Sequence, residues 1–266
     1  MNEQQLADIF AQLKEKRPLV HHITNYVTVN DCANVTMFIG AAPVMAEAVE
    51  EVEEMVAMAG ALVLNIGTLR REQVGSMLVA GRQANRLDIP VVLDPVGAGA
   101  TGYRTEVAKQ LLTELRVAVI KGNAGEIGTL AGTGGKVRGV DSAGMSGDPV
   151  QVAKALAGMT RAVVVMSGPT DIITDGARTA RVDNGHELMG SISGTGCMAS
   201  SIVGAFAAAS MDRFMSSTAA LSAFGIAGEL AAGRATSPYS YKTALMDEVA
   251  ALDPAKLAKL AKVRWD

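Results

Sequence analysis

Short apolar runs separated by helical segments constrain the fold of this 266-residue chain more than any other feature. Strands that are apolar along their whole length are typical of parallel sheets covered by helices on both faces. Alternation of strand and helix predicts right-handed crossovers and an α/β fold with a central, mostly parallel sheet. The runs are ALVL (61–64), VVL (91–93), VAVI (117–120) and AVVVM (162–166).

Composition indicates one compact folded unit. The chain is 49% hydrophobic and 19% charged, which is outside the range of disordered segments. Because no stretch has the composition of a linker, we expect a single domain over residues 1–266. The opening MNEQQLADIF lacks the layout of a secretory signal, and Cys32 and Cys197 are interpreted as reduced thiols, so we expect a cytoplasmic protein.

Charge and aromatic content argue against several partners. A net charge of −3 without a basic stripe, together with 4% aromatic residues, disfavours nucleic-acid binding. The uncharged stretch from Leu188 to Met211 is long enough to span a membrane, but it is too rich in Gly, Ser and Thr, so we expect no membrane association. The two distant cysteines do not have the spacing of a zinc site.

The stretch GSISGTGCMASSIVGAFAAAS (190–210) predicts an anion site at a helix N-terminus. Free backbone amides at Gly194, Thr195, Gly196 and Cys197 would hold a transferring phosphoryl group, and the flanking glycines would let it approach the backbone. Cys197 lies in the first turn, where the helix dipole is expected to lower the pKa of its thiol. The alternative is a buried core helix that merely begins with a flexible loop.

Polar residues follow each apolar run, and ligands bind beyond the carboxyl ends of parallel strands. Asp94 and Glu126 are predicted to hold Mg²⁺, which binds one or two carboxylates and keeps several waters. Lys121 is predicted to pair with phosphates. The alternatives are a turn-forming Asp94 before Pro95, a Glu126 that only complements its helix dipole, and a surface lysine. The polar clusters are Asn65–Thr68, Asp94–Gly99, Lys121–Asn123 and Ser167–Thr170.

Neither of two common nucleotide motifs is present in its usual setting. The run GAGATG (97–102) has the GxGxxG spacing, but it does not stand at the first strand–turn–helix position that a dinucleotide fingerprint takes, and there is no GxxxxGK[ST] loop. Nucleotide binding by either of those routes is therefore disfavoured.

Local patterns predict several further features. They are a hairpin over Asp171–Asp183, a Gly-rich loop over Gly132–Gly147, a core position for Cys32, a strand-end position for Met45, and a helix over 47–60 with Val49, Val52, Met55 and Val56 facing inward. His21 and His22 are adjacent on one strand, so they point to opposite faces and cannot chelate one ion.

Six ordered motifs resemble the hydroxyethylthiazole kinases of thiamin biosynthesis and salvage. That resemblance implies a ribokinase-like, three-layer α/β/α fold. It also implies transfer of the ATP γ-phosphoryl group, with Mg²⁺, to the hydroxyethyl group of 4-methyl-5-(2-hydroxyethyl)thiazole. The motifs are PLVHHITNYVTVNDCAN, GAAPVMAEAVEEV, GALVLNIGTL, VVLDPVGAGATGYRTE, VIKGNAGEI and GTGCMASSIVGAF.

The resemblance also implies roles for individual residues. Cys197 occupies the place where most ribokinase-like enzymes have an aspartate base. The family implies a homotrimer with the thiazole pocket at the subunit boundary, where Met45 of one subunit lies beside Cys197 of another. The implied thiazole contacts are Met45 and Gly194, with Asn25 and Gly67 nearby; the implied ATP contacts are Lys121 and Ser167, where many relatives have Arg and Thr.

Three other functions stay open from the sequence. A hydroxymethylpyrimidine kinase would share the superfamily but not the cysteine at the base position. A catalytically silent regulator that binds nucleotide or a thiamin precursor would release no ADP. A Rossmann oxidoreductase would bind NADH.

Overall fold

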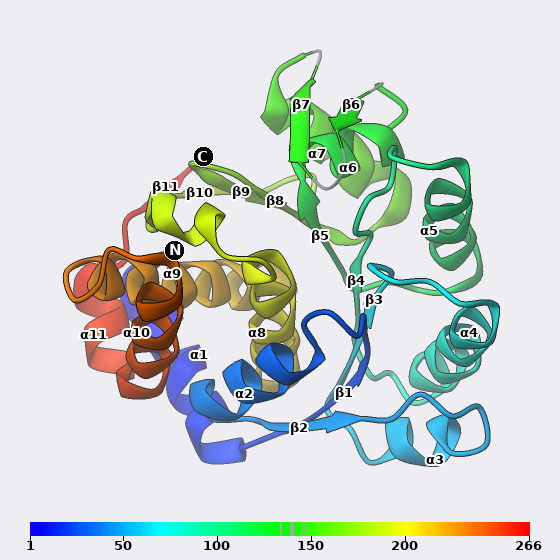
Figure 1. The fold of residues 1–266 in the computed structure, drawn as a ribbon, viewed down its shortest axis with the longest axis horizontal. Helices are drawn as coiled ribbons and strands as arrows, with labels where there is room; N and C mark the ends of the chain where they lie inside the picture. The colour runs from blue at the N-terminus through cyan, green and yellow to red at the C-terminus, as the bar shows by residue number, and fades with distance from the viewer. Residues whose placement is uncertain (134, 139–140, 146) are drawn as a thin grey trace.

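A nine-stranded sheet forms the centre of the described part of the chain (Figure 1). The structure is a computed structural model that describes residues 1–133, 135–138, 141–145 and 147–266, with side chains described outside 134–146. Six adjacent strands are parallel, and the three at one edge are antiparallel. In sheet order the strands are β11 (Val263–Trp265), β10 (Thr179–Val182), β9 (Asp171–Thr174), β8 (Val163–Ser167), β5 (Val119–Asn123), β4 (Val91–Asp94), β3 (Ala61–Asn65), β1 (Leu19–Ile23) and β2 (Ala42–Met45).

Helices cover both faces of this sheet, as Figure 1 shows, so the predicted three-layer α/β/α architecture is confirmed. One layer contains α1 (Glu3–Lys16), α2 (Val29–Ile39), α8 (Thr195–Ala209), α9 (Arg213–Ala232), α10 (Pro238–Ala251) and α11 (Pro254–Leu260). The other contains α3 (Val52–Ala57), α4 (Arg71–Arg86), α5 (Gly102–Glu114), α6 (Ala124–Leu130) and α7 (Pro149–Thr160).

The pleat explains why the central strands are apolar throughout. On β3, Val63 belongs to the core beneath the α8 layer, whereas Leu62 and Leu64 belong to the opposite core. Successive side chains of a strand point to opposite faces, so a sheet buried on both faces needs apolar residues at every position.

Helix α8 lies unusually close to the sheet. A Cβ atom on Gly204 would stand 2.4 Å from Cγ2 of Val63, closer than real Cβ contacts allow. Only glycine therefore permits this approach, which fixes where the N-terminus of α8 lies relative to the strand ends.

The predicted hairpin is confirmed, because β9 and β10 pair antiparallel around Asp175 and Gly176. The predicted loop over Gly132–Gly147 is wrong in part: β6 (Gly135–Arg138) and β7 (Asp141–Met145) pair antiparallel, while residues 134, 139–140 and 146 lie outside the described residues. Strands rich in Gly and Ser lack the apolar alternation from which a strand is predicted.

The predicted helix over 47–60 is too long. Only Val52–Ala57 is helical. Val52 and Val56 face inward as predicted, whereas Val49 is exposed and Met55 is half-buried. The Glu47 carboxylate accepts a hydrogen bond from Gln73 and pairs with Arg70, which holds this residue on the loop before the helix.

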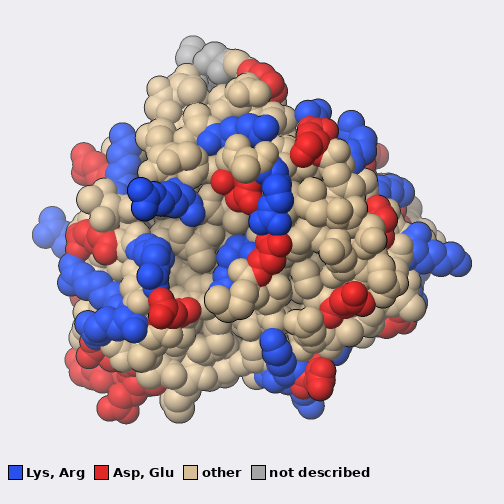
Figure 2. Space-filling model, turned by 180° about the vertical axis from the view of Figure 1, so that it is seen from behind, with Lys and Arg blue, Asp and Glu red and all other residues tan. Residues whose placement is uncertain are grey.

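Acidic and basic side chains are interspersed over the face opposite that of Figure 1 (Figure 2). Exposed ion pairs such as Arg86–Glu53 and Arg116–Asp88 contribute little to stability individually. Within the described ranges, none of the helices combines the length and the apolar character that crossing a membrane requires.

Candidate active site

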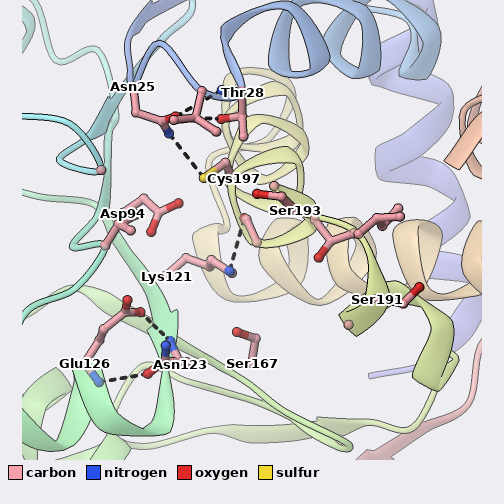
Figure 3. Close-up of a pocket in the computed structure, with 18 residues that line it drawn as sticks. Asn25, Thr28, Asp94, Lys121, Asn123, Glu126, Ser167, Ser191, Ser193 and Cys197 are labelled. Atoms are coloured by element: carbon pink, nitrogen blue, oxygen red, sulfur yellow. Dashed lines mark hydrogen bonds between the residues drawn. The ribbon is translucent and has the colours of Figure 1, made fainter. Parts of the chain in front are cut away.

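A cavity of about 480 Å³ opens where β1, β3, β4, β5 and β8 end and α8 begins (Figure 3). It unites residues that are up to 172 positions apart in the sequence, such as Asn25 and Cys197. Nearly all the predicted site residues line it: Asn25, Gly67, Asp94, Lys121, Glu126, Ser167, Gly194, Thr195, Gly196 and Cys197.

The N-terminus of α8 forms one wall of this cavity. Gly194 caps the helix with φ of +96°, and no side chain in the described part of the chain caps α8. A Cβ atom at this position would stand 2.5 Å from Cγ2 of Thr28, so the turn requires glycine. Thr195, Gly196 and Cys197 line the cavity, and the first amides of a helix have no intrahelical acceptor. The wall therefore offers backbone donors and a positive dipole end to an anion.

Lys121 is buried beside this wall, so its interpretation as a surface lysine is wrong. Its Nζ donates to the carbonyl oxygen of Gly196 at 3.1 Å. Figure 3 shows the side chain pointing into the space between Cys197 and Ser167. A cation in this position favours a negatively charged ligand in the cavity.

Asp94 ends β4 and is held by two donors. Its Oδ2 accepts hydrogen bonds from Nδ2 of Asn65 at 2.8 Å and from Oγ of Ser200 at 2.7 Å. Burial raises the pKa of Asp94, while Lys121 and these two donors oppose the rise. The residue is thus more than a turn former before Pro95.

Glu126 both caps α6 and lines the cavity. Its Oε1 accepts from the Gly97 amide at 2.8 Å, and its Oε2 accepts from the Asn123 amide at 2.7 Å. Burial, and next the charge of Asp94, raises the pKa of Glu126 to about 7. Glu126 therefore does serve the N-terminus of its helix, as the alternative interpretation held. The same contacts also place its carboxylate within reach of a ligand in the cavity.

The prediction that the helix dipole lowers the pKa of Cys197 is wrong. Burial raises the pKa of this thiol, and the charge of Asp94 raises it further. Asn25 Nδ2 donates to Sγ at 3.3 Å. Hydrogen bonds with Thr28 and Asn65 and the charge of Lys121 oppose the rise, but they do not offset the loss of hydration. The thiol is consequently protonated at neutral pH.

Among the described residues, no three or more His, Cys, Asp or Glu side chains cluster as a metal site would require. Asp94 and Glu126 are the carboxylates that line the cavity. Such a donor set fits a cation that keeps waters and shares a phosphate, as Mg²⁺ does, and does not fit an all-protein cage.

Met45 is the one predicted substrate contact that does not line this cavity. It lines a second pocket of about 260 Å³, together with His22 and Gln73. His22 and its neighbour His21 are both buried, and burial lowers the pKa of His22 to about 4. Within one chain, therefore, Met45 and Cys197 line different pockets. Cys32 is buried in α2 as expected.

Sequence reasoning assigned no individual role to three residues that shape the site, namely Thr28, Asn65 and Ser200, although it placed Asn65 in one of the polar clusters at the strand ends. Thr28 N donates to Oδ1 of Asn25 at 3.0 Å. Ser200 lies four residues after Gly196 on α8, so helical periodicity places it on the same side of the helix. That spacing was the available signal for Ser200; no pattern identifies the contact between Asn65 and Asp94.

The chain is similar to proteins of known family. A sequence model described as the hydroxyethylthiazole kinase family matches residues 10–255. Hydroxyethylthiazole kinase of Methanosphaerula palustris is 66% identical over 259 residues, covering 97% of this chain and 98% of that protein. The protein of the same name from Methanocella arvoryzae is 65% identical over 265 residues, with 100% of both chains covered.

Solved structures agree. The hydroxyethylthiazole kinase protein of Pyrococcus horikoshii OT3 superposes with a TM-score of 0.91 at 41% identity, and the match covers 98% of each chain. A ribokinase-like superfamily protein of Enterococcus faecalis superposes with a TM-score of 0.62 at 12% identity, covering 94% of this chain and 95% of that one. This second likeness concerns the fold alone and identifies it as ribokinase-like.

The raised pKa of Glu126 predicts a pH-dependent stability. A carboxyl whose pKa rises from 4.5 to about 7 on folding stabilises the protein fully below its unfolded pKa, and this contribution is lost as the pH rises through 7. Glu126→Gln cannot ionise, so it should gain on the order of 1–3 kcal/mol relative to the wild type between pH 5 and pH 8. Urea unfolding of the metal-free proteins measures this gain.

Glu114→Gln serves as the control for this measurement. Hydrogen bonds from Gln110 and Arg82 lower the pKa of Glu114, so its titration lies below this pH window. A difference between Glu126→Gln and wild type that stays constant from pH 5 to pH 8 would contradict the assignment.

Proposed function

This chain belongs to the hydroxyethylthiazole kinase family, and we propose that it phosphorylates the hydroxyethyl group of 4-methyl-5-(2-hydroxyethyl)thiazole with ATP, in thiamin biosynthesis or salvage. The observation that carries the proposal is a single cavity holding the α8 amides, a buried lysine, two carboxylates and a thiol. Phosphoryl transfer relies mainly on positioning and charge stabilisation, and these groups supply both.

The nucleotide phosphates are assigned to the wall formed by α8. The amides of Thr195, Gly196 and Cys197 would donate hydrogen bonds to the γ-phosphoryl group, with Gly194 allowing its approach. Lys121 supplies a fixed positive charge, and a lysine acts there as a point charge without the bidentate fork of arginine. Ser167, at the end of β8, donates to the Gly122 carbonyl oxygen at 3.3 Å and lines the same side of the cavity.

Asp94 and Glu126 fit the Mg²⁺ that the family implies. Both hydrogen bonds of Asp94 use Oδ2, so Oδ1 is left to contact a cation. Each oxygen of Glu126 already accepts a backbone amide, so this carboxylate suits contact through a water. When bound, Mg²⁺ neutralises charge that develops on the transferring phosphate.

Cys197 is assigned to the acceptor side, where the oxygen of the alcohol forms a bond to the γ-phosphorus while the bond from γ-phosphorus to the β-phosphate oxygen breaks, so that ADP leaves. The hydroxyl proton passes to an oxygen of the transferred phosphoryl group. Because the pKa of the thiol is raised, it is a poor base at neutral pH. We therefore assign it to orienting the hydroxyl group. Asn25 and Gly67 line the cavity next to it and are assigned to the thiazole.

We further propose that one domain spanning residues 1–266 assembles as a cytoplasmic homotrimer. Tyr26 lines the pocket of Met45, Val27 lines the pocket of Cys197, and both side chains are largely exposed. An exposed apolar loop between the two pockets fits a subunit boundary at this place, and the resemblance to the family implies that Met45 of one subunit lies there beside Cys197 of another.

Turnover tests the function directly. Release of ADP should require both Mg²⁺ and the thiazole alcohol, and it should be slower with hydroxymethylpyrimidine, measured in a coupled ADP assay. Nucleotide binding without ADP release would contradict the proposal and favour a regulator, whereas faster release with the pyrimidine would reassign the substrate.

Replacement of Cys197 tests its role. Cys197→Ala should lower kcat by roughly 10- to 100-fold with little change in the KM for the thiazole, because a misoriented hydroxyl group slows the chemical step more than it weakens binding. Cys197→Ser should recover part of this loss, since a hydroxyl can also orient the alcohol. Steady-state kinetics measures both, with Cys32→Ala as the control for removal of a thiol. An unchanged kcat in Cys197→Ala would show that the thiol is a bystander.

A further inference from the structure

The two sides of the cavity are joined by hydrogen bonds between side-chain amides. Asn65 Nδ2 donates to Oδ2 of Asp94 at 2.8 Å, and Asn65 Oδ1 accepts from Nδ2 of Asn25 at 2.9 Å. Asn25 Nδ2 also donates to Sγ of Cys197 at 3.3 Å. A continuous path therefore runs from the carboxylate to the thiol (Figure 3 shows its Asn25, Cys197 and Asp94 members).

The direction of both amides is fixed by backbone N–H groups, which can only donate. The Gly67 amide donates to Oδ1 of Asn65 at 2.9 Å, and the Thr28 amide donates to Oδ1 of Asn25 at 3.0 Å. These contacts identify the oxygen of each side chain without ambiguity. Each NH₂ group must then face Asp94 or Cys197, so both receive the positive end of an amide dipole.

Ser200 provides the second donor to the carboxylate. Its Oγ lies 2.7 Å from Oδ2 of Asp94. Ser200 belongs to α8, the helix whose N-terminus forms one wall of the cavity. Asp94 is therefore held by β3 through Asn65 and by α8 through Ser200. Both donors converge on Oδ2, which fixes the carboxylate plane and leaves Oδ1 for the cavity.

We propose that Asn65 is a positioning residue that couples the carboxylate on the phosphate side of the cavity to the thiol on the acceptor side, while Ser200 positions the carboxylate alone. Both side chains are buried and do not line the cavity, so they act through Asp94, Asn25 and Cys197. The role assigned to Asp94 rests on the proposed function; the contacts of Asn65 with Asn25 and Asp94 do not.

Ser200→Ala and Asn65→Ala separate the role of Ser200, which positions Asp94 alone, from that of Asn65, which also acts on Cys197. Each removes one donor from the carboxylate and should raise the Mg²⁺ concentration for half-maximal turnover by about tenfold, as expected for loss of a hydrogen bond to a charged group. Ser201→Ala is the control, because Ser201 lies next on the same helix and its Oγ contacts the Cys197 carbonyl oxygen at 3.2 Å and the Cys32 thiol instead of Asp94. This control should keep the wild-type Mg²⁺ dependence.

A second readout needs neither nucleotide nor metal. The pH dependence of the alkylation rate with iodoacetamide reports Cys197, because Cys32 is buried and its pKa is raised to about 12. Asn65 lowers the pKa of the Cys197 thiol, so Asn65→Ala should move the alkylation midpoint upward by about half a unit to one unit. Ser200→Ala should cause no upward movement.

The split between the two readouts decides the proposal. The proposal is supported if the alkylation midpoint moves upward in Asn65→Ala but not in Ser200→Ala, and if both variants need more Mg²⁺ for half-maximal turnover. An unchanged midpoint in Asn65→Ala, or equal upward movement in both variants, overturns it. If Asn65→Ala does not fold, Asn65→Ser replaces it, since a hydroxyl is too short to reach both partners.

A wild type that does not phosphorylate the alcohol would refute the proposed function, while the alkylation midpoint still tests the Asn65 contact.

Discussion

The close packing of α8 against β3 is the contact on which the geometry of the site depends. Gly204 allows the helix to approach Val63, and Gly194 allows its first turn to lie against Thr28. Because α8 also carries Ser200, one rigid helix places the phosphate-binding amides and a donor to Asp94. A shift of this helix would disturb both sides of the reaction at once.

The charged groups of the cavity are arranged for a ligand with its own charge. Asp94 and Glu126 are both buried, the charge of Asp94 helps to raise the pKa of Glu126, and Lys121 offsets only part of these effects. Such a cluster lowers the stability of the ligand-free protein, since buried carboxylates lose hydration. A nucleotide with its cation would balance these charges, which accounts for their burial at the carboxyl ends of apolar strands.

Much of this arrangement is predictable from sequence, and the remainder has a physical reason. Apolar runs predict the parallel sheet, and the residues after each run predict Asp94, Lys121 and Ser167 at one rim because parallel strands end together. The raised pKa of Cys197 was not predicted, because helix position says nothing about the burial that dominates it. The contacts of Asn65 and Ser200 with Asp94 depend on side-chain directions across three elements, which no local pattern encodes. Met45 was placed by resemblance, and a single chain does not bring it to the cavity of Cys197.

A crystal structure with a non-hydrolysable ATP analogue, Mg²⁺ and the thiazole alcohol tests the central assignment most directly. The account predicts that the terminal phosphate lies within hydrogen-bond distance of the amides of Thr195, Gly196 and Cys197, with the alcohol oxygen beside Sγ of Cys197. A terminal phosphate bound away from the N-terminus of α8, for example in the pocket of Met45 and His22, would contradict it.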